Sequence, residues 1–258
     1  MVEKMKVIVF DTETIGKVSQ DLINVGYAIL DIDIQHGDGK ILVERDYLVR
    51  NLVDNKVYCL NDEFVGAEKL AMFEKGIADG KSIKRNLKQI YQTLLNDIKK
   101  HSVLFGYAYN CKFDLDKFKT QVPDGMINPL DSIPVFDIWD YAIDRICNTE
   151  DYKCWATENT IFTESGGYIS TSVESVCKYL YKDLEFKEDH TALSDVAHET
   201  YILLECIRRG ADITRGLKTN HFIANDVERT EIIVVDGNEQ EIKFKKKYSR
   251  NGKTYYKS

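Results

Sequence analysis

The sequence predicts an α/β fold, in which a mixed sheet of five strands is flanked by helices and followed by a small C-terminal β-meander. Three observations lead to this fold class. Strand patterns come first along the 258-residue chain, strands and helices alternate afterwards, and the pattern changes again beyond about residue 230. We therefore expect a main domain over residues 1–215 and an appended basic meander over residues 216–258.

The five strands are expected where apolar and β-branched residues run between turn residues. These runs cover residues 6–10, 25–33, 41–49, 103–109 and the start of 134–146. The first run, KVIVF, ends at Asp11, as expected of a buried central strand that brings a polar residue to its carboxyl end. Gly37-Asp38-Gly39 marks the turn between the second and third strands.

Apolar residues at three- and four-residue spacing indicate the helices that cover the sheet. Ser82 is the expected N-cap of a long helix whose apolar residues run from Ile83 to Ile98. The other helices are expected near residues 112–119, in the second part of 134–146, over 173–180 with Thr171 or Ser172 as the cap, and near 192–208 with Gly210 as the stop.

Charge and composition exclude several classes of protein. No apolar run approaches the roughly 18 residues that a membrane span needs, and the N-terminal residues lack a signal-peptide pattern. We therefore expect a cytoplasmic protein with no membrane contact. The six cysteines form no C-x-x-C pair and no Cys/His zinc spacing, so reduced thiols are expected.

The last sixteen residues differ from the rest of the chain in charge. Residues 243–258 hold seven lysines or arginines and no acid, so residues 1–242 carry −14 although the net charge is −7. Two interpretations stay open: the lysines contact nucleic-acid phosphates, or they protect an edge strand from aggregation. A docking surface for another protein is a third.

Three short motifs place carboxylates near predicted strand ends. Asp11-Thr12-Glu13-Thr14 follows the first strand, and its two acids, two residues apart, can point to one side of the sheet. Asn110 and Asp114 follow the strand 103–109, and His190 precedes Asp195 by five residues at the start of the last helix. Carboxylates gathered in this way suit hard divalent cations.

In this order, D-x-E, N-x-x-F-D and H-x-x-x-x-D, the motifs resemble those of the DEDDh 3′–5′ exonucleases. That superfamily includes the proofreading epsilon subunit of bacterial DNA polymerase III, ribonuclease T and oligoribonuclease. The resemblance covers about residues 6–209, including residues 171–180, which look like the helix before the third motif. Thr191 stands where a sister subgroup has Tyr, which favours the His type. The departures are Ile15, where a Thr is common, and Tyr109, where a His is common.

The resemblance implies a ribonuclease H-like fold and a metal-dependent exonuclease. Such an enzyme releases nucleoside 5′-monophosphates from a single-stranded DNA or RNA 3′ end. It acts alone or with a polymerase or other protein partner. It implies two Mg²⁺ or Mn²⁺ ions, with Asp11 shared between them, Glu13 and Asp195 on one, and Asp114 on the other. His190 is then the general base. Substrate contacts are implied for the neighbouring residues Thr12, Thr14, Asn110 and Phe113.

Two other functions stay open at this point. The D-x-E-T motif after a first strand is also similar to the nucleophile motif of haloacid dehalogenase-type phosphatases, although these need Asp where this chain has Glu13. The other is a nuclease-like module that binds nucleic acid or protein without catalysis. Four mutually repelling carboxylates argue against it, because a pure binder does not need them.

Several residues near the motifs have a structural interpretation beside the functional one. Asn110 and Phe113 either contact the nucleotide or close the turn and pack in the core. His198 competes with His190 but is expected about one turn away from the site. In the segment 51–80, which borders the substrate cleft in the resembled family, four apolar residues either wedge the terminal bases or belong to the core: Phe64, Leu70, Met72 and Phe73.

Overall fold

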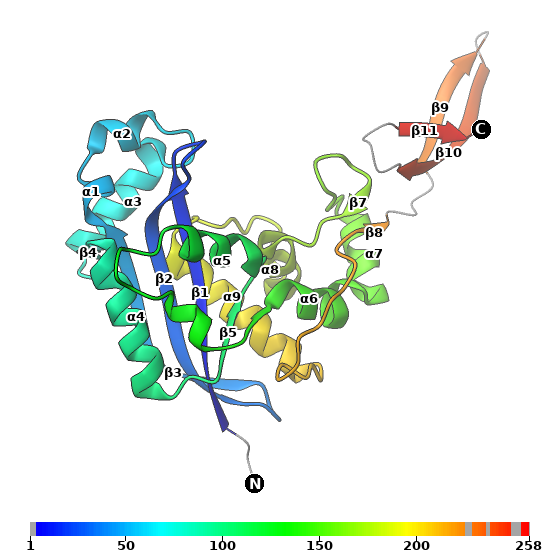
Figure 1. The fold of residues 1–258 in the computed structure, drawn as a ribbon. Helices are drawn as coiled ribbons and strands as arrows, with labels where there is room; N and C mark the ends of the chain where they lie inside the picture. Colours follow the sequence, from blue (N-terminus) through cyan, green and yellow to red (C-terminus); the bar gives the residue numbers. More distant parts are fainter. Residues whose placement is uncertain (1–3, 225–228, 236–237, 249–253, 258) are drawn as a thin grey trace.

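A mixed six-stranded sheet forms the centre of the protein (Figure 1). The computed structural model describes residues 4–224, 229–235, 238–248 and 254–257. The strand order is β4-β3-β2-β1-β5-β6, and β2 alone runs antiparallel to its neighbours. The strands of this sheet are β1 (Lys4–Ile15), β2 (Asp21–Asp33), β3 (Asp38–Val49), β4 (Ile83–Arg85), β5 (Phe105–Ala108) and β6 (Val135–Asp137).

The prediction of five strands was wrong by one, and the extra strand explains a second error. Ser82 was expected to cap the long helix, but residues 83–85 instead form β4, which pairs in parallel with β3. The helix begins at Leu87, where Asn86 and Gln89 form a reciprocal capping box. Ser82 donates a hydrogen bond to Asp46. A tertiary contact therefore replaced the expected local cap.

Helices cover both faces of the sheet (Figure 1). The α-helices are α1 (Arg50–Val53), α2 (Lys56–Asn61), α3 (Gly66–Ala78), α4 (Leu87–His101), α5 (Cys111–Thr120), α6 (Ile138–Ala142), α7 (Glu150–Glu158), α8 (Val173–Tyr181) and α9 (Ala192–Arg208). A 3₁₀ turn spans Pro129–Ser132, and a π-helical turn spans Ile143–Cys147. Ser172 caps α8, and α9 has the predicted bounds.

Strand β1 is buried on both faces, as predicted for a central strand. Val7 and Val9 pack in the same core as α9, whereas Ile8 and Phe10 pack in the core that contains α4. Alternate residues of a strand point to opposite faces, so this one apolar run supplies both cores. The polar residues that follow it are thereby held in a fixed position between two packed layers.

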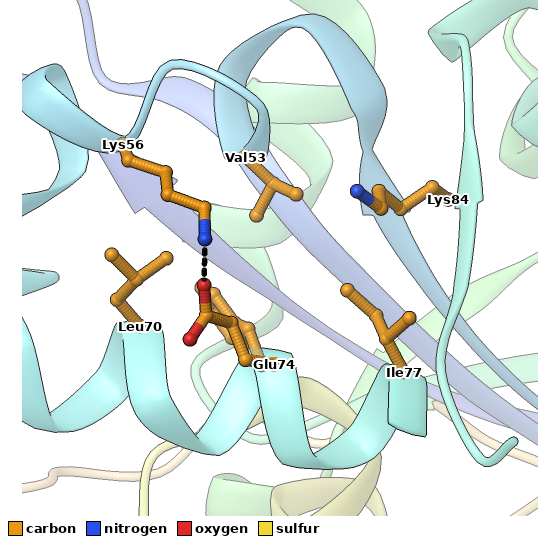
Figure 2. A pocket seen from close by; sticks show the side chains of 7 residues that line it. Val53, Lys56, Leu70, Glu74, Ile77 and Lys84 are labelled. Carbon is orange, nitrogen blue, oxygen red and sulfur yellow. Dashed lines mark hydrogen bonds and ion pairs between the residues drawn. The ribbon is translucent and has the colours of Figure 1, made fainter. Parts of the chain in front are cut away.

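The segment 51–80 folds into α1, α2 and α3 and builds a third, smaller core at the end of the sheet. Leu70 and Phe73 are buried there with Ile15 and Leu48. A cavity of about 160 Å³ lies between these helices and β4. Apolar and charged side chains both line it (Figure 2). Both lysines at its rim are paired, Lys56 with Glu74 and Lys84 with Asp54. The cavity is therefore a feature of packing.

The chain beyond α9 first returns to the main body. Thr219 donates two hydrogen bonds of 2.8 Å to Asp140, and His221 stacks on Trp139. Strand β8 (Ile223–Ala224) then pairs with β7 (Tyr168–Ile169). The part of the predicted appendage up to residue 224 thus packs on the main body. The domain division at 215 and 216 stays a prediction.

A three-stranded antiparallel sheet follows, as the sequence predicted. It consists of β9 (Arg229–Val235), β10 (Asn238–Tyr248) and β11 (Thr254–Lys257), in the order β11-β10-β9. The turns expected at 236–237 and 251–252 and the side chains of the basic tail lie outside the described residues. Within the described part of the chain, no helix has the length and apolar character that crossing a membrane requires.

Candidate metal site

The first motif lies inside β1 and not after it, which corrects the sequence prediction. Asp11 pairs with Gly26 and Glu13 with Asn24 of β2, and the register shifts between Glu13 and Thr14. The strand is longer than its apolar run because β2 continues to pair with it beyond Phe10. Two residues apart on one strand, the two carboxylates lie on the same face of the sheet.

The second motif is anchored to the first by a hydrogen bond. Asp114, in the first turn of α5, is buried, and the Thr12 hydroxyl donates to its Oδ1 at 2.6 Å. The Thr12 side chain is itself 4% exposed, so the structure places it on Asp114 rather than at the surface. Asn110 has a left-handed backbone with φ of 57° and closes the turn before α5. Asn adopts this conformation more easily than most residues.

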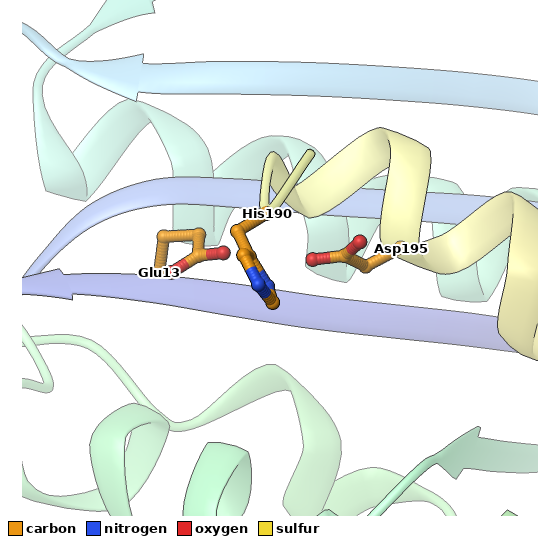
Figure 3. Close-up of side chains that lie close together, drawn as sticks. All are labelled: Glu13, His190 and Asp195. Atoms are coloured by element: carbon orange, nitrogen blue, oxygen red, sulfur yellow. The ribbon is translucent and has the colours of Figure 1, made fainter. Parts of the chain in front are cut away.

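The third motif brings His190 and Asp195 to Glu13. One ligand atom from each of these three side chains lies within 4.8 Å of the others (Figure 3). Asp195 is in the first turn of α9 and is buried, whereas His190 is exposed. The backbone of His190 has φ of 51°, a left-handed conformation that costs an ordinary residue about 1–2 kcal/mol. Such strain is typical of functional positions.

Burial and mutual repulsion raise the pKa values of the clustered carboxyl groups. Burial raises the pKa of Asp11 well above its usual value, and the charges of Asp114 and Glu199 add to this. Burial, followed by the charge of Glu188, raises the pKa of Asp195 to about 8. Burial also raises the pKa of Asp114 to about 7, although Thr12 stabilises its ionised form. A cation among these groups would stabilise their ionised forms and so oppose the rise in pKa.

The chemistry of the donor atoms fits a divalent cation. Among the described residues, three carboxylate oxygens near the motifs are buried without a hydrogen-bond partner: Asp11 Oδ2, Asp195 Oδ1 and Glu199 Oε2. Buried polar atoms normally have partners, so an exception requires an explanation. Oxygen ligands from several carboxylates are what Mg²⁺ and Mn²⁺ prefer. These residues can therefore hold such an ion.

Two residues of this site were not predicted from the sequence. Lys69 of α3 lies 2.9 Å from Glu13 Oε2 and supplies a positive charge beside the cluster. No sequence signal identified it, since a lysine on an amphipathic helix is common. Glu199 lies one turn after Asp195 on α9, and that four-residue spacing could have indicated a shared face.

An open cleft adjoins the cluster. Its volume is about 420 Å³, and its walls include Glu13, Thr14 and His190. The rings of Phe64 and Phe113 also line it, with 47% and 37% of their surface exposed. Of the four apolar residues singled out in the segment 51–80, only Phe64 lines this cleft. Leu70 and Phe73 are core residues, and Met72 lines a different cavity.

His198, the competitor of His190, faces away from this cleft. Its Nδ1 atom lies 3.0 Å from the Tyr181 hydroxyl, and its ring packs edge-on against Phe186. Burial lowers its pKa, which keeps the imidazole neutral. The structural interpretation therefore accounts for His198.

No protein-family model matches this chain, and no curated protein matches it either. The fold and the site thus define its class by themselves: an α/β protein with a candidate metal-binding group of Glu13, His190 and Asp195 at one end of a mixed sheet.

Proposed function

We propose that the protein is a metal-dependent 3′–5′ exonuclease of the DEDDh type with a ribonuclease H-like fold. One observation carries the proposal: side chains of all three motifs lie together, because Glu13 is grouped with His190 and Asp195 and Thr12 is bonded to Asp114. Asp11 and Asp195 each keep an unpaired buried oxygen, and an open cleft adjoins Glu13 and His190. The six-stranded order β4-β3-β2-β1-β5-β6, in which only β2 is antiparallel, is compatible with a ribonuclease H-like fold.

Four carboxylates would hold the metal ions, namely Asp11, Glu13, Asp114 and Asp195. When bound, Mg²⁺ or Mn²⁺ supplies Lewis-acid stabilisation of the charge that develops around phosphorus. The grouping of Glu13 with Asp195 supports their assignment to one ion. Asp11 and Asp114 would contribute to a second ion, and the hydrogen bond from the Thr12 hydroxyl fixes the Asp114 carboxylate.

His190 would take a proton from the attacking water. It is the only imidazole in the candidate metal-binding group, and its exposure leaves the ring open to the cleft. Histidine is the side chain that most often serves as a general base. The Glu13 carboxylate lies beside the ring in the candidate group.

The terminal nucleotide would occupy the cleft beside Glu13. Phe64 lies between α2 and α3, and Phe113 lies in α5. Both present exposed rings on which bases can stack. Lys117 lies 4.9 Å from the centre of the Phe113 ring and adds a positive charge there. Stacking of this kind favours a single-stranded end, because the bases of a duplex are already stacked.

Digestion of 5′-labelled single-stranded DNA and RNA oligomers tests this function. With Mg²⁺ or Mn²⁺ we expect stepwise shortening from the 3′ end and release of nucleoside 5′-monophosphates, and a chelator should stop it. Asp11→Asn should be inactive, and Asp97→Asn, which changes a buried carboxylate outside the site, should remain active. Intact 3′ ends with both ions would refute the proposal, and an aspartyl-phosphate trapped on Asp11 would support the phosphatase alternative.

A further inference from the structure

The helix that carries Asp195 is capped by a residue from another strand. The N-cap residue of α9, Thr191, makes no side-chain cap hydrogen bond to the helix. Instead, Asn24 Oδ1 of β2 accepts a hydrogen bond from the Ala192 backbone N–H at 2.9 Å. Asn24 is fully buried and is the cross-strand partner of Glu13. One side chain therefore connects the strand beside Glu13 to the start of α9.

The orientation of Asn24 is fixed from its other side. Its Nδ2 donates to Asp46 Oδ1 at 2.6 Å and to the Tyr47 carbonyl at 3.1 Å. Asp46 in turn accepts a hydrogen bond from the Ser82 hydroxyl, and both of these residues are buried. Because the amide nitrogen has two acceptors, the amide oxygen must face Ala192. The three side chains form one hydrogen-bonded network, which we call the Asn24–Asp46–Ser82 relay.

Close packing at Gly26 holds the helix start against the same strand. A Cβ atom at this position would lie 2.4 Å from the Ala192 carbonyl carbon, so only glycine allows the observed approach. Residues 24 and 26 are two apart on β2 and share one face. The backbone of Ala192 is thus fixed by a hydrogen bond and by direct contact.

We propose that the Asn24–Asp46–Ser82 relay is a positioning device that sets the distance from Glu13 to Asp195, and thereby the affinity of the site for a divalent cation, and that it positions His190 beside them. His190 and Asp195 lie two residues before and three residues after Ala192, so a shift of the helix start moves both. Asn24 itself is a positioning residue. The inference rests on the metal site of the proposed function.

Mn²⁺ titration calorimetry on the full chain tests the relay. Loss of an outer partner that orients metal ligands typically lowers affinity by about 10–100-fold, and we expect this for Asn24→Ala. The matched control is Asn128→Ala, which removes another buried asparagine that caps a helical turn by accepting from the Leu130 N–H. The control should melt earlier than the wild type, yet bind Mn²⁺ with unchanged affinity.

A donor–acceptor exchange keeps the test decisive if Asn24→Ala does not fold. Asn24→Asp alone places two carboxylates face to face and should weaken Mn²⁺ binding. The double variant Asn24→Asp with Asp46→Asn restores an amide–carboxylate pair, and its Mn²⁺ affinity should recover to within about threefold of the wild type. Unchanged affinity in both Asn24→Ala and Asn24→Asp would overturn the relay alone. A wild-type chain that binds no Mn²⁺ would overturn the metal site itself, and the relay with it.

Discussion

Buried carboxylates in this protein fall into two groups that differ in how they are satisfied. Away from the site, Asp97 accepts from the Tyr27 hydroxyl at 2.9 Å and pairs with Arg45, and Asp140 accepts from Thr219 and His221. At the site, Asp11, Asp195 and Glu199 each keep one buried oxygen without a partner in the described structure. The first group stabilises the fold, whereas the second has the unpaired oxygens that the proposed metal site would use.

The unpaired oxygens at the site cost folding free energy. A buried polar group without a partner destabilises the folded chain by about 1–3 kcal/mol, and more if it is charged. Burial therefore shifts these carboxyl groups toward their neutral forms, as the raised pKa of Asp195 shows. Local destabilisation of this kind is expected where function requires the arrangement. Substitutions in each group test whether the two groups differ in this way.

The largest effect is expected on activity, from His190→Ala. Loss of a general base typically lowers kcat by about 10²–10⁴-fold. Mn²⁺ affinity should change little if His190 acts as a base, because the carboxylates carry the ligand role. Steady-state digestion kinetics and Mn²⁺ titration on the same sample measure both. A loss of Mn²⁺ affinity as large as the loss of kcat would show that His190 is a ligand.

The next effect concerns metal-dependent stability. A ligand present at about 100 times its Kd stabilises the folded state by about 2.7 kcal/mol. Saturating Mg²⁺ or Mn²⁺ should therefore raise the melting temperature of the wild type. Asp195→Asn should lose most of this increase, and Asp97→Asn should keep it. Equal increases in the two variants would place the bound ion elsewhere.

A smaller effect is expected on stability without metal. Asp97→Asn removes the negative charge that pairs with Arg45 and leaves a weaker, uncharged acceptor for the Tyr27 hydroxyl, so it should lower the free energy of unfolding by about 1–3 kcal/mol. Glu199→Gln keeps the oxygen that accepts from the Tyr109 N–H and removes a repelling charge, so stability should stay equal or increase. Urea unfolding in a chelator measures both. Destabilisation by Glu199→Gln similar to that of Asp97→Asn would place Glu199 in the first group.

A further effect is a dependence of stability on pH without metal. The folded pKa values of Asp114 and Asp195, about 7 and about 8, lie above the unfolded value near 4. Between these values the folded state binds more protons, so the free energy of unfolding should fall as pH rises from about 5 to 8. Asp195→Asn should reduce this slope, and saturating Mg²⁺ should oppose it because bound ligands are deprotonated. A wild-type chain that becomes more stable over this range without metal would contradict the raised pKa values.

Residue patterns were sufficient for most elements and for the motifs from which the candidate site is built. The bounds of α9, the Ser172 cap and the buried strand before Asp11 follow from local spacing, because helix and strand periods and caps are properties of adjacent residues. The motifs likewise indicated which carboxylates would meet, since strand ends and helix starts gather at one end of a sheet.

The tertiary structure decided what depends on contacts between distant residues. Only the folded chain shows that residues 83–85 pair with β3, that Lys69 reaches Glu13, and that Asn24 caps a helix 168 residues further along the sequence. Local propensity cannot determine these contacts, because their free energy comes from packing and hydrogen bonds that form only when the chain is folded. The sequence by itself indicated the three motifs, whereas the fold decided which further residues, such as Lys69 and Asn24, join them and how closely they are held.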